Sequence, residues 1–229
     1  MSRPLVLKGI LFDLDGTLAD TAPDLCGALN DLCLRYQRPT QTLEQTRPFV
    51  SQGARGLIRI GFGIEPGAPY YEELRQEFME LYESRQSRHS QLFPGILTVL
   101  EYLDQHQIPW GIVTNKITRF THPVLEQLGL TGRTPCIISG DTCARPKPYP
   151  DPLLAAAEVL LLEPAQLVYI GDDERDMVAA EAAGMPGLVA LWGYLAPSPR
   201  PVEHWPALAF VNTPTDLLAT LLPLLSLSR

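Results

Sequence analysis

Residues 11–20 read LFDLDGTLAD, in which Asp13 and Asp15 close an apolar run and are followed at once by a glycine and a threonine. Acidic residues next to glycine often mark only a turn. The run that they close, VLKGILFD at 6–13, is nearly continuous in apolar residues, which is typical of a strand buried on both faces of a parallel sheet. The stretch therefore predicts a buried strand that carries two carboxylates at its carboxyl end.

Similar apolar runs recur along the chain, and helical patterns separate most of them. The runs lie at 108–114, 136–139, 167–171, 187–192 and 207–211, and the helical patterns at 94–106, 119–129, 150–162, 174–184 and 214–225. Alternation of strands and helices is typical of a doubly wound α/β domain with a Rossmann-like parallel sheet. The sequence therefore predicts this fold class.

The interval between the first two strands is far longer than one crossover helix requires. It contains the segments 21–37, 51–62 and 70–86, of which the first and last have apolar residues at helical spacing. We therefore expect an inserted α-helical cap domain at 18–92, and an α/β core domain made of residues 1–17 and 93–229.

Composition narrows the class of protein. The chain has 229 residues, 45% of them hydrophobic, and a formal charge of −8, which argues against a general nucleic-acid binder. Lys8 and Asp13 interrupt the first apolar stretch, so it is no convincing signal peptide, and the other apolar runs are too short for a bilayer. The four cysteines have no paired spacing, which indicates free thiols. We expect a cytoplasmic protein, monomer or homodimer, with no nucleic-acid or membrane partner.

Polar side chains follow four successive strands of the predicted sheet. They are Asp13 and Asp15 after the first, Thr114-Asn115-Lys116 after the second, Lys147 in ARPKPYPDP (144–152) after the third, and GDDERD (171–176) after the fourth. Ligands of open α/β sheets bind beyond the carboxyl ends of the strands. These groups are therefore expected to share one crevice.

Phosphoryl transfer is the chemistry that this set of groups fits. One carboxylate, Asp13, can form an aspartyl-phosphate, and the other, Asp15, can protonate the leaving oxygen and later activate water. Two carboxylates repel a phosphate unless a cation lies between them, and Mg²⁺ with Asp172 as a further ligand meets that need. Thr114 and Lys147 are expected to bind the phosphoryl oxygens.

The four motifs LFDLDGTLADT, IVTNK, RPKPYPDP and IGDDERDM resemble, in order and separation, those of the haloacid dehalogenase-like (HAD) hydrolase superfamily. The resemblance implies a HAD-type phosphatase with Asp13 as nucleophile, Asp15 as general acid/base, Thr114 on the phosphate and Lys147 as the third-motif cation. It also implies a magnesium site of Asp13, the Asp15 carbonyl and Asp172. Asp173 and Asp176 are each expected either to bind the metal directly or to orient a ligand.

The cap is expected to select the substrate. Gly16 and Thr17 are predicted to bend the chain around the phosphate, and Asn115 is a candidate for substrate contact or for fixing its loop. In the cap loop SQGARG (51–56), Gly53 permits close approach and Arg55 is a candidate partner for a substrate carboxylate. Arg119 is expected to contact the substrate or the cap.

Two families with carboxylate-bearing substrates resemble this chain. The cap size and core motifs are similar to those of phosphoglycolate phosphatases. SQGARG, HSQLFPG (89–95), WGIVTNKITRF (110–120) and GDDERD are more similar to those of N-acetylmuramic acid 6-phosphate phosphatases of cell-wall recycling. The latter substrate is favoured. Phosphoglycolate hydrolysis, a β-phosphoglucomutase-like phosphotransfer and a non-catalytic binding protein on the same scaffold are the alternatives.

Overall fold

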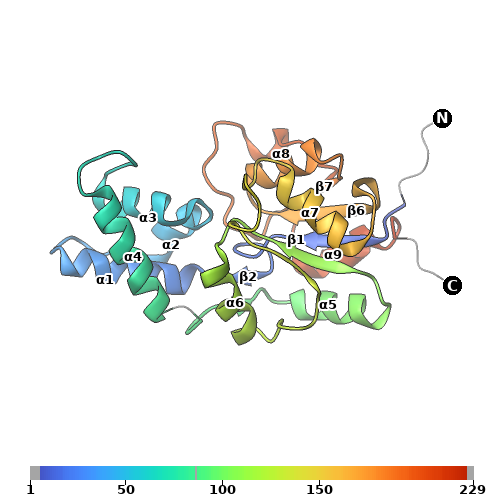
Figure 1. Cartoon of the computed structure of the whole chain (residues 1–229), viewed down its shortest axis with the longest axis horizontal. Coiled ribbons are helices and arrows are strands. Elements are labelled where there is room, and N and C mark those ends of the chain that lie inside the picture. The colour runs from blue at the N-terminus through green and yellow to red at the C-terminus, as the bar shows by residue number, and fades with distance from the viewer. Residues whose placement is uncertain (1–5, 86, 226–229) are drawn as a thin grey trace.

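A parallel sheet forms the centre of the structure, a computed structural model that describes residues 6–85 and 87–225. Its strands are β1 (Gly9–Phe12), β4 (Trp110–Val113), β5 (Cys136–Ile138), β6 (Leu167–Gly171), β7 (Gly187–Ala190) and β8 (Ala209–Val211). They lie in the order β5-β4-β1-β6-β7-β8 (Figure 1). Ile10 of β1 lies opposite Trp110 of β4 and Val168 of β6, so the strand that carries Asp13 is central. The predicted fold class is confirmed.

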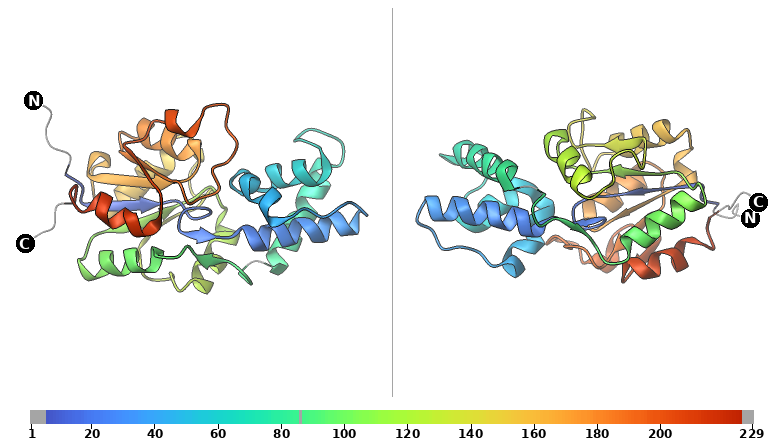
Figure 2. Two further views of the ribbon diagram at one scale, coloured as in Figure 1. Left: turned by 180° about the vertical axis from the view of Figure 1, so that it is seen from behind. Right: turned by 90° about the horizontal axis from the view of Figure 1, so that it is seen from below.

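Helices cover both faces of this sheet (Figure 2). Their bounds are α5 (Ile96–Gln105), α6 (Thr118–Gln127), α7 (Asp151–Leu160), α8 (Glu174–Ala182) and α9 (Pro214–Leu221). Ile10 and Phe12 pack in one apolar cluster with α5, α6 and α9, whereas Leu11 packs in another with α7 and α8. Successive strand residues point to opposite faces, and both faces are buried, which explains the continuous apolar runs.

The segment between β1 and β4 forms a separate helical unit beside the carboxyl edge of the sheet (Figure 1). Its elements are α1 (Ala22–Arg35), α2 (Leu43–Thr46), the 3₁₀ helix η1 (Arg47–Gln52), α3 (Gly53–Phe62) and α4 (Tyr71–Arg85). Helices α1, α3 and α4 bury a further apolar cluster, which Phe120 of α6 and Tyr194 of the core also join. We call the unit from α1 to α4 the cap.

The chain enters and leaves the cap through a short antiparallel pair, β2 (Ala19–Asp20) and β3 (Gln91–Leu92). Leu18 and Ala19 still pack in the core cluster. The domain boundaries at 17/18 and 92/93 remain a prediction. The strands β2 and β3 lie close in the sequence to these two boundaries.

Most predicted elements are present with ends that differ by a few residues. The first strand is shorter than 6–13 because Leu7 joins only an isolated bridge to Leu225. The sequence pattern missed α2, a single turn that the Thr42–Gln45 capping box stabilises. The four cysteines are free thiols. Residue 86 of the predicted segment 70–86, and residues 1–5 and 226–229 of the predicted core domain, lie outside the described residues.

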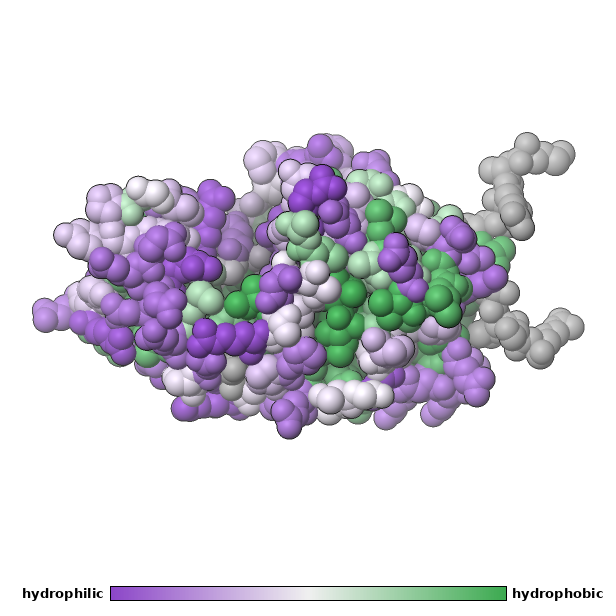
Figure 3. Space-filling model, viewed as in Figure 1, coloured by the Kyte–Doolittle hydropathy of each residue, from purple (hydrophilic) through white to green (hydrophobic). Residues whose placement is uncertain are grey.

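The surface of the cap differs from that of the core. In the view of Figure 3, hydrophilic residues cover most of the cap, whereas hydrophobic ones gather over the core near α7. Leu154, Val159 and Leu161 are exposed there. In the part of the chain that the structure describes, no helix combines the length and the apolar character that a bilayer crossing requires.

Candidate active site

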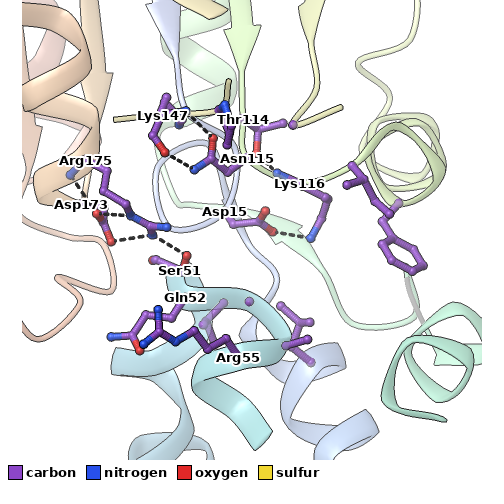
Figure 4. A pocket seen from close by; sticks show the side chains of 18 of the residues that line it. Asp15, Ser51, Gln52, Arg55, Thr114, Asn115, Lys116, Lys147, Asp173 and Arg175 are labelled. Atoms are coloured by element: carbon purple, nitrogen blue, oxygen red, sulfur yellow. Dashed lines mark hydrogen bonds and ion pairs between the residues drawn. The ribbon is translucent and has the colours of Figure 1, made fainter. Parts of the chain in front are cut away.

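The polar groups of the four strand ends meet at one pocket, which lies between the carboxyl edge of the sheet and the cap (Figure 4). Its volume is about 390 Å³. The core contributes Asp13, Asp15, Thr114 and Lys147. The cap contributes α4 and the SQGARG segment, which forms the end of η1 and the start of α3 and not the predicted loop. The predicted common crevice is therefore present.

Asp13 follows β1 directly and is held from one side by Lys147. The Lys147 ammonium donates to Asp13 Oδ1 at 2.8 Å and to the Val113 carbonyl at 3.1 Å. It also lies 2.7 Å from Asp176 Oδ1 and 2.6 Å from the Tyr169 hydroxyl. Only 4% of Lys147 is exposed. The structure thus buries the third-motif lysine between two carboxylates, where its flexible stem has no freedom to move.

Asp13, Asp172 and Asp176 form a buried carboxylate cluster, with one oxygen of each within 4.8 Å of the others. Burial raises the pKa of Asp13 to about 7; Lys147 opposes this rise, and Asp176 and Asp15 add to it. Burial and the charges of Asp13 and Asp176 raise the pKa of Asp172 well above its usual range. Burial alone would lower the pKa of Lys147, but the two adjacent carboxylates outweigh it and raise that pKa.

The hydrogen bonds of Asp172 also indicate a cation in this cluster. Among the residues that the structure describes, its hydrogen-bond donors are neutral: the Tyr194 amide at 2.7 Å and the Thr17 hydroxyl at 3.2 Å. Lys147 alone cannot balance three buried carboxylates, and buried charges are costly unless they are paired or bind a metal. Oxygen donors of this kind suit a divalent cation such as Mg²⁺. The cluster therefore fits the divalent metal typical of the family.

Gly16 and Thr17 lie against Asp172 and do not line the pocket. Gly16 has φ +94°, and a Cβ at this position would lie 2.2 Å from Asp172 Oδ2. Only glycine fits this close approach. The structure thus places the glycine of LFDLDGT beside a cluster carboxylate, and the role of both residues in substrate binding remains a prediction.

Asp15 lies on the pocket side of Asp13, and two groups hold its carboxylate. Lys116 Nζ lies 2.9 Å from Asp15 Oδ1, and the Thr21 hydroxyl donates to the same oxygen. Lys116 also lies 5.1 Å from the centroid of the Tyr82 ring of the cap. The second aspartate is therefore tied to β4 through Lys116 and to the start of the cap through Thr21.

The side chains of Thr114 and Asn115 have different surroundings. The Thr114 hydroxyl accepts from the Lys116 amide at 3.1 Å, which leaves its proton for a group in the pocket. The Asn115 amide donates to the Lys147 carbonyl at 2.9 Å and accepts from the Lys147 amide at 3.0 Å. Asn115 therefore fixes the loop that carries Lys147, and substrate contact by its side chain remains a prediction.

The two acidic residues after Asp172 have different surroundings. Asp176 belongs to the carboxylate cluster, whereas Asp173 caps α8 and accepts from Arg175 Nε at 2.8 Å and Nη2 at 2.9 Å. Arg175 Nη2 also donates to the Ser51 carbonyl of the cap at 2.6 Å (Figure 4). This hydrogen bond joins the core directly to η1 of the cap at the pocket.

The cap side of the pocket is largely apolar. The side chains of Val50, Tyr71, Phe78, Met79 and Tyr82 line it. Gly53, with φ +61°, lies in the pocket wall, and a Cβ there would meet nothing within 4 Å. We call this surface the apolar wall.

Arg55 lies at the rim of the same wall. Its Nε donates to Glu65 Oε2 at 3.0 Å, and its side chain is 65% exposed. Arg119 lies elsewhere: its guanidinium donates to Glu83 of α4, so it contacts the cap from α6. Of the two arginines considered for the substrate, the structure therefore brings only Arg55 to the pocket.

Several site residues escaped the sequence analysis. Arg175 lies within GDDERD, whose acidic residues indicate a metal site and not a basic group. Tyr169 lies two residues before Gly171, on a strand whose pattern is apolar. Tyr194 has no motif around it, and Thr21 is the last residue of LFDLDGTLADT, a pattern that indicates no role for it. Lys116 stood in the quoted IVTNK stretch, and its position at a strand end was the available signal.

Comparison with known proteins gives this arrangement a family. A family model described as haloacid dehalogenase-like hydrolase matches residues 10–190, so the chain belongs to this family. It is 43% identical, over 92% of its length and 94% of the relative, to a phosphoglycolate phosphatase of Xanthomonas campestris. It is 36% identical, over 92% of its length and 94% of the relative, to an N-acetylmuramic acid 6-phosphate phosphatase of Pseudomonas putida.

A solved structure shares the fold. The haloacid dehalogenase-like family hydrolase of Streptococcus pneumoniae matches with a TM-score of 0.80 and 24% identity over 93% of this chain and 98% of that chain. With the family match and the phosphatase relatives, the chain is a phosphatase of the HAD-like hydrolase family. The resemblance found in the four motifs is confirmed, and the alternative of a non-catalytic binding protein is set aside.

Proposed function

We propose that the chain is a Mg²⁺-dependent phosphomonoesterase that acts through an aspartyl-phosphate on Asp13. The observation that carries the mechanism is the bond from Lys147 to Asp13 Oδ1, which fixes the carboxylate beside the pocket. Asp13, Asp172 and Asp176 would hold the metal, and the Asp15 carbonyl is a further candidate ligand. When bound, the ion supplies charge neutralisation between the carboxylates and the phosphate.

Two displacements at phosphorus complete the reaction. An oxygen of Asp13 bonds to phosphorus while the ester P–O bond breaks, and Asp15 gives its proton to the departing alkoxide oxygen. Water then bonds to phosphorus as the Asp13–phosphorus bond breaks, and Asp15 takes the proton of that water. Inorganic phosphate leaves and Asp13 is regenerated. The Thr114 hydroxyl and the Lys147 ammonium bind phosphoryl oxygens, where negative charge is concentrated.

The substrate that we propose is N-acetylmuramic acid 6-phosphate, with phosphoglycolate as the second candidate. Its support is the pocket of about 390 Å³ with an apolar wall. Ligand pockets bury most of the surface of their ligand. A two-carbon ester would leave most of this volume empty, whereas an amino sugar would fill more of it and bring a ring and methyl groups to Tyr71, Phe78 and Met79. The second candidate is favoured by the higher identity of the phosphoglycolate phosphatase relative.

Arg55 is the proposed partner for the lactyl carboxylate of the sugar. Its present partner Glu65 is 42% exposed, and ion pairs between exposed groups contribute little. Exchange of this pair for a substrate carboxylate is therefore inexpensive. A guanidinium binds a carboxylate through two parallel hydrogen bonds, which gives geometric selectivity as well as affinity.

The test is phosphate release from N-acetylmuramate 6-phosphate, N-acetylglucosamine 6-phosphate, phosphoglycolate and a nucleoside monophosphate. We expect the muramate ester to be the best substrate, and Arg55→Ala to reduce its advantage over the glucosamine ester by about tenfold. The glucosamine ester is the internal control, because it has no carboxylate. Equal rates on the two sugars would contradict the substrate, and a large preference for phosphoglycolate would favour the second candidate. Dependence on a sugar bisphosphate would instead indicate a phosphotransferase.

A further inference from the structure

Tyr194 contacts both the carboxylate cluster and the cap, although it belongs to neither. It lies in the loop after β7, and 5% of it is exposed. Its amide donates to Asp172 Oδ2 at 2.7 Å. Its hydroxyl accepts from the amides of Thr21 at 2.8 Å and Ala22 at 3.0 Å, and it donates to Asp20 Oδ1 at 3.0 Å. One residue thus spans from the cluster to the first turn of α1.

The hydrogen-bonding capacity of the Tyr194 hydroxyl is fully used. A phenol offers one donor and two acceptor positions, and the three bonds occupy all of them. The amides at the start of a helix have no partner inside the helix, and the Tyr194 oxygen accepts from those of Thr21 and Ala22, the latter shared with Asp20 Oδ1 at 3.3 Å. In Tyr194→Phe, the two amides and Asp20 would each lose a hydrogen bond in a buried environment, which is costly.

The ring of Tyr194 lies between the two chain crossings of the cap. The strand that enters the cap contains Asp20, and Phe93, whose ring centroid is 6.4 Å away, follows the strand that leaves it. The side chain also packs in the apolar cluster of the cap. A movement of the cap about these crossings would therefore have to move against this ring.

The other end of the residue is equally constrained. Gly193 packs on Asp172 so closely that a Cβ would lie 2.2 Å from Asp172 Cβ. The loop therefore has little freedom beside the cluster. Thr21, whose amide Tyr194 binds, also donates its hydroxyl to Asp15. A continuous series of hydrogen bonds thus connects Asp172, Tyr194, Thr21 and Asp15.

We propose that Tyr194 is a positioning residue for the phosphatase reaction. It holds the start of the cap at a fixed place relative to Asp172, and through Thr21 it aims Asp15 at the leaving oxygen. The second part rests on the proposed function, since it takes Asp15 as the proton donor. The first part depends only on the carboxylate cluster and the cap.

The experiment compares Tyr194→Phe with the wild-type enzyme on two kinds of ester. Phosphoglycolate and N-acetylmuramate 6-phosphate have alkoxide leaving groups that need a proton, whereas the leaving group of p-nitrophenyl phosphate does not. We expect kcat/KM to fall about tenfold on the alkyl esters and less than about twofold on the aryl ester, since misaimed proton donation affects only the former. A purely structural defect would lower both equally and would overturn the proposal.

Asp15→Asn and Phe93→Leu are the reference variants. Phe93→Leu reduces packing on the Tyr194 ring and leaves the hydroxyl in place, so we expect a lower Tm with an unchanged ratio between the esters. Asp15→Asn should also lower kcat/KM selectively on the alkyl esters, and by a larger factor than Tyr194→Phe. If Asp15→Asn is selective and Tyr194→Phe is not, the Tyr194 inference is wrong while the proposed function stands.

Hydrogen exchange at the amides of Thr21 and Ala22, measured without substrate, tests the first part separately. Tyr194→Phe keeps the backbone amide that donates to Asp172 and removes the hydroxyl that accepts from these two amides, so we expect their exchange to become about tenfold faster. Phe93→Leu should leave their exchange unchanged. If Asp15→Asn proves unselective, the proton-donor role in the proposed function is wrong, and the exchange rates alone decide the role of Tyr194. Unchanged exchange in Tyr194→Phe would overturn that role.

Discussion

The core wall and the cap wall of the pocket are built by different means. On the core side, charged groups are buried and hold one another: Lys147 is 4% exposed and has two carboxylate neighbours, and Asp172 is fully buried. On the cap side, the charged Arg55 is 65% exposed and pairs with Glu65 at the surface. The proposed reacting groups are therefore held in place on the core side, whereas the side chains on the cap side can adjust to the rest of a substrate.

This difference matches a division of tasks. Electrostatic catalysis requires charged groups that do not rearrange during the reaction, which burial and shared hydrogen bonds provide. Recognition of different alcohols requires a surface that can change without disturbing that set. Substitutions on the two walls should therefore differ in kind, with effects on rate and stability at the core and effects on KM at the cap.

The largest effect is expected for Asp13→Asn, which removes the proposed nucleophile. We expect kcat to fall by a factor on the order of 10⁴ or more, as for other nucleophile replacements. Phosphate release measures this, and circular dichroism checks the fold. Substantial activity in a folded Asp13→Asn protein would contradict the aspartyl-phosphate mechanism.

Lys147→Met should be the next largest change and should affect stability as well as rate. Removing a buried cation leaves Asp13 and Asp176 unpaired, which costs about 3–5 kcal/mol of unfolding free energy. Denaturant unfolding of the metal-free protein measures it. Arg119→Ala is the matched control, because its pair with Glu83 is 46% and 43% exposed and joins core to cap at the surface. The comparison fails if both variants are equally stable.

The sequence contained the core wall almost completely. Apolar runs that end in polar residues predict both the strands and the edge where those residues meet, so Asp13, Thr114 and Lys147 could be placed in one crevice from the chain alone. Asp172 was expected in the same crevice and lies buried beside it, in the cluster with Asp13. Helix ends were less certain because capping and single turns such as α2 leave weak patterns. The separation of Asp176 from Asp173 depended on which side of α8 faces the cluster.

Contacts between distant segments could not be predicted in this way. Lys116 pairs with Asp15, Arg175 bonds the Ser51 carbonyl, and Tyr194 binds amides at the start of α1, yet each pair joins residues far apart along the chain. No short motif records such a pairing. The relation between the cap and the core therefore required the structure, and most of the missed residues belong to that relation.

The dependence on metal should again differ between variants of the core wall and variants of the cap wall. We expect a chelator to abolish activity and added Mg²⁺ to restore it. Asp172→Asn should raise the Mg²⁺ concentration for half-maximal activity by about 100-fold, since it replaces a proposed carboxylate ligand with a neutral amide. Arg55→Ala should leave this concentration unchanged. Metal-independent turnover by the wild-type enzyme would contradict the role given to the carboxylate cluster.

Glu65→Gln should give the smallest effect, and in the favourable direction. The substitution releases Arg55 from its surface pair, so less interaction is lost when the guanidinium turns to a substrate carboxylate. We expect KM for N-acetylmuramate 6-phosphate to fall about two- to fivefold, the range that exposed ion pairs span, with kcat unchanged. KM for N-acetylglucosamine 6-phosphate should stay the same because that ester offers no carboxylate. Equal changes on both sugars would mean that Glu65 acts on the shape of the cap, and Arg55 would then lose its proposed role in selecting the substrate.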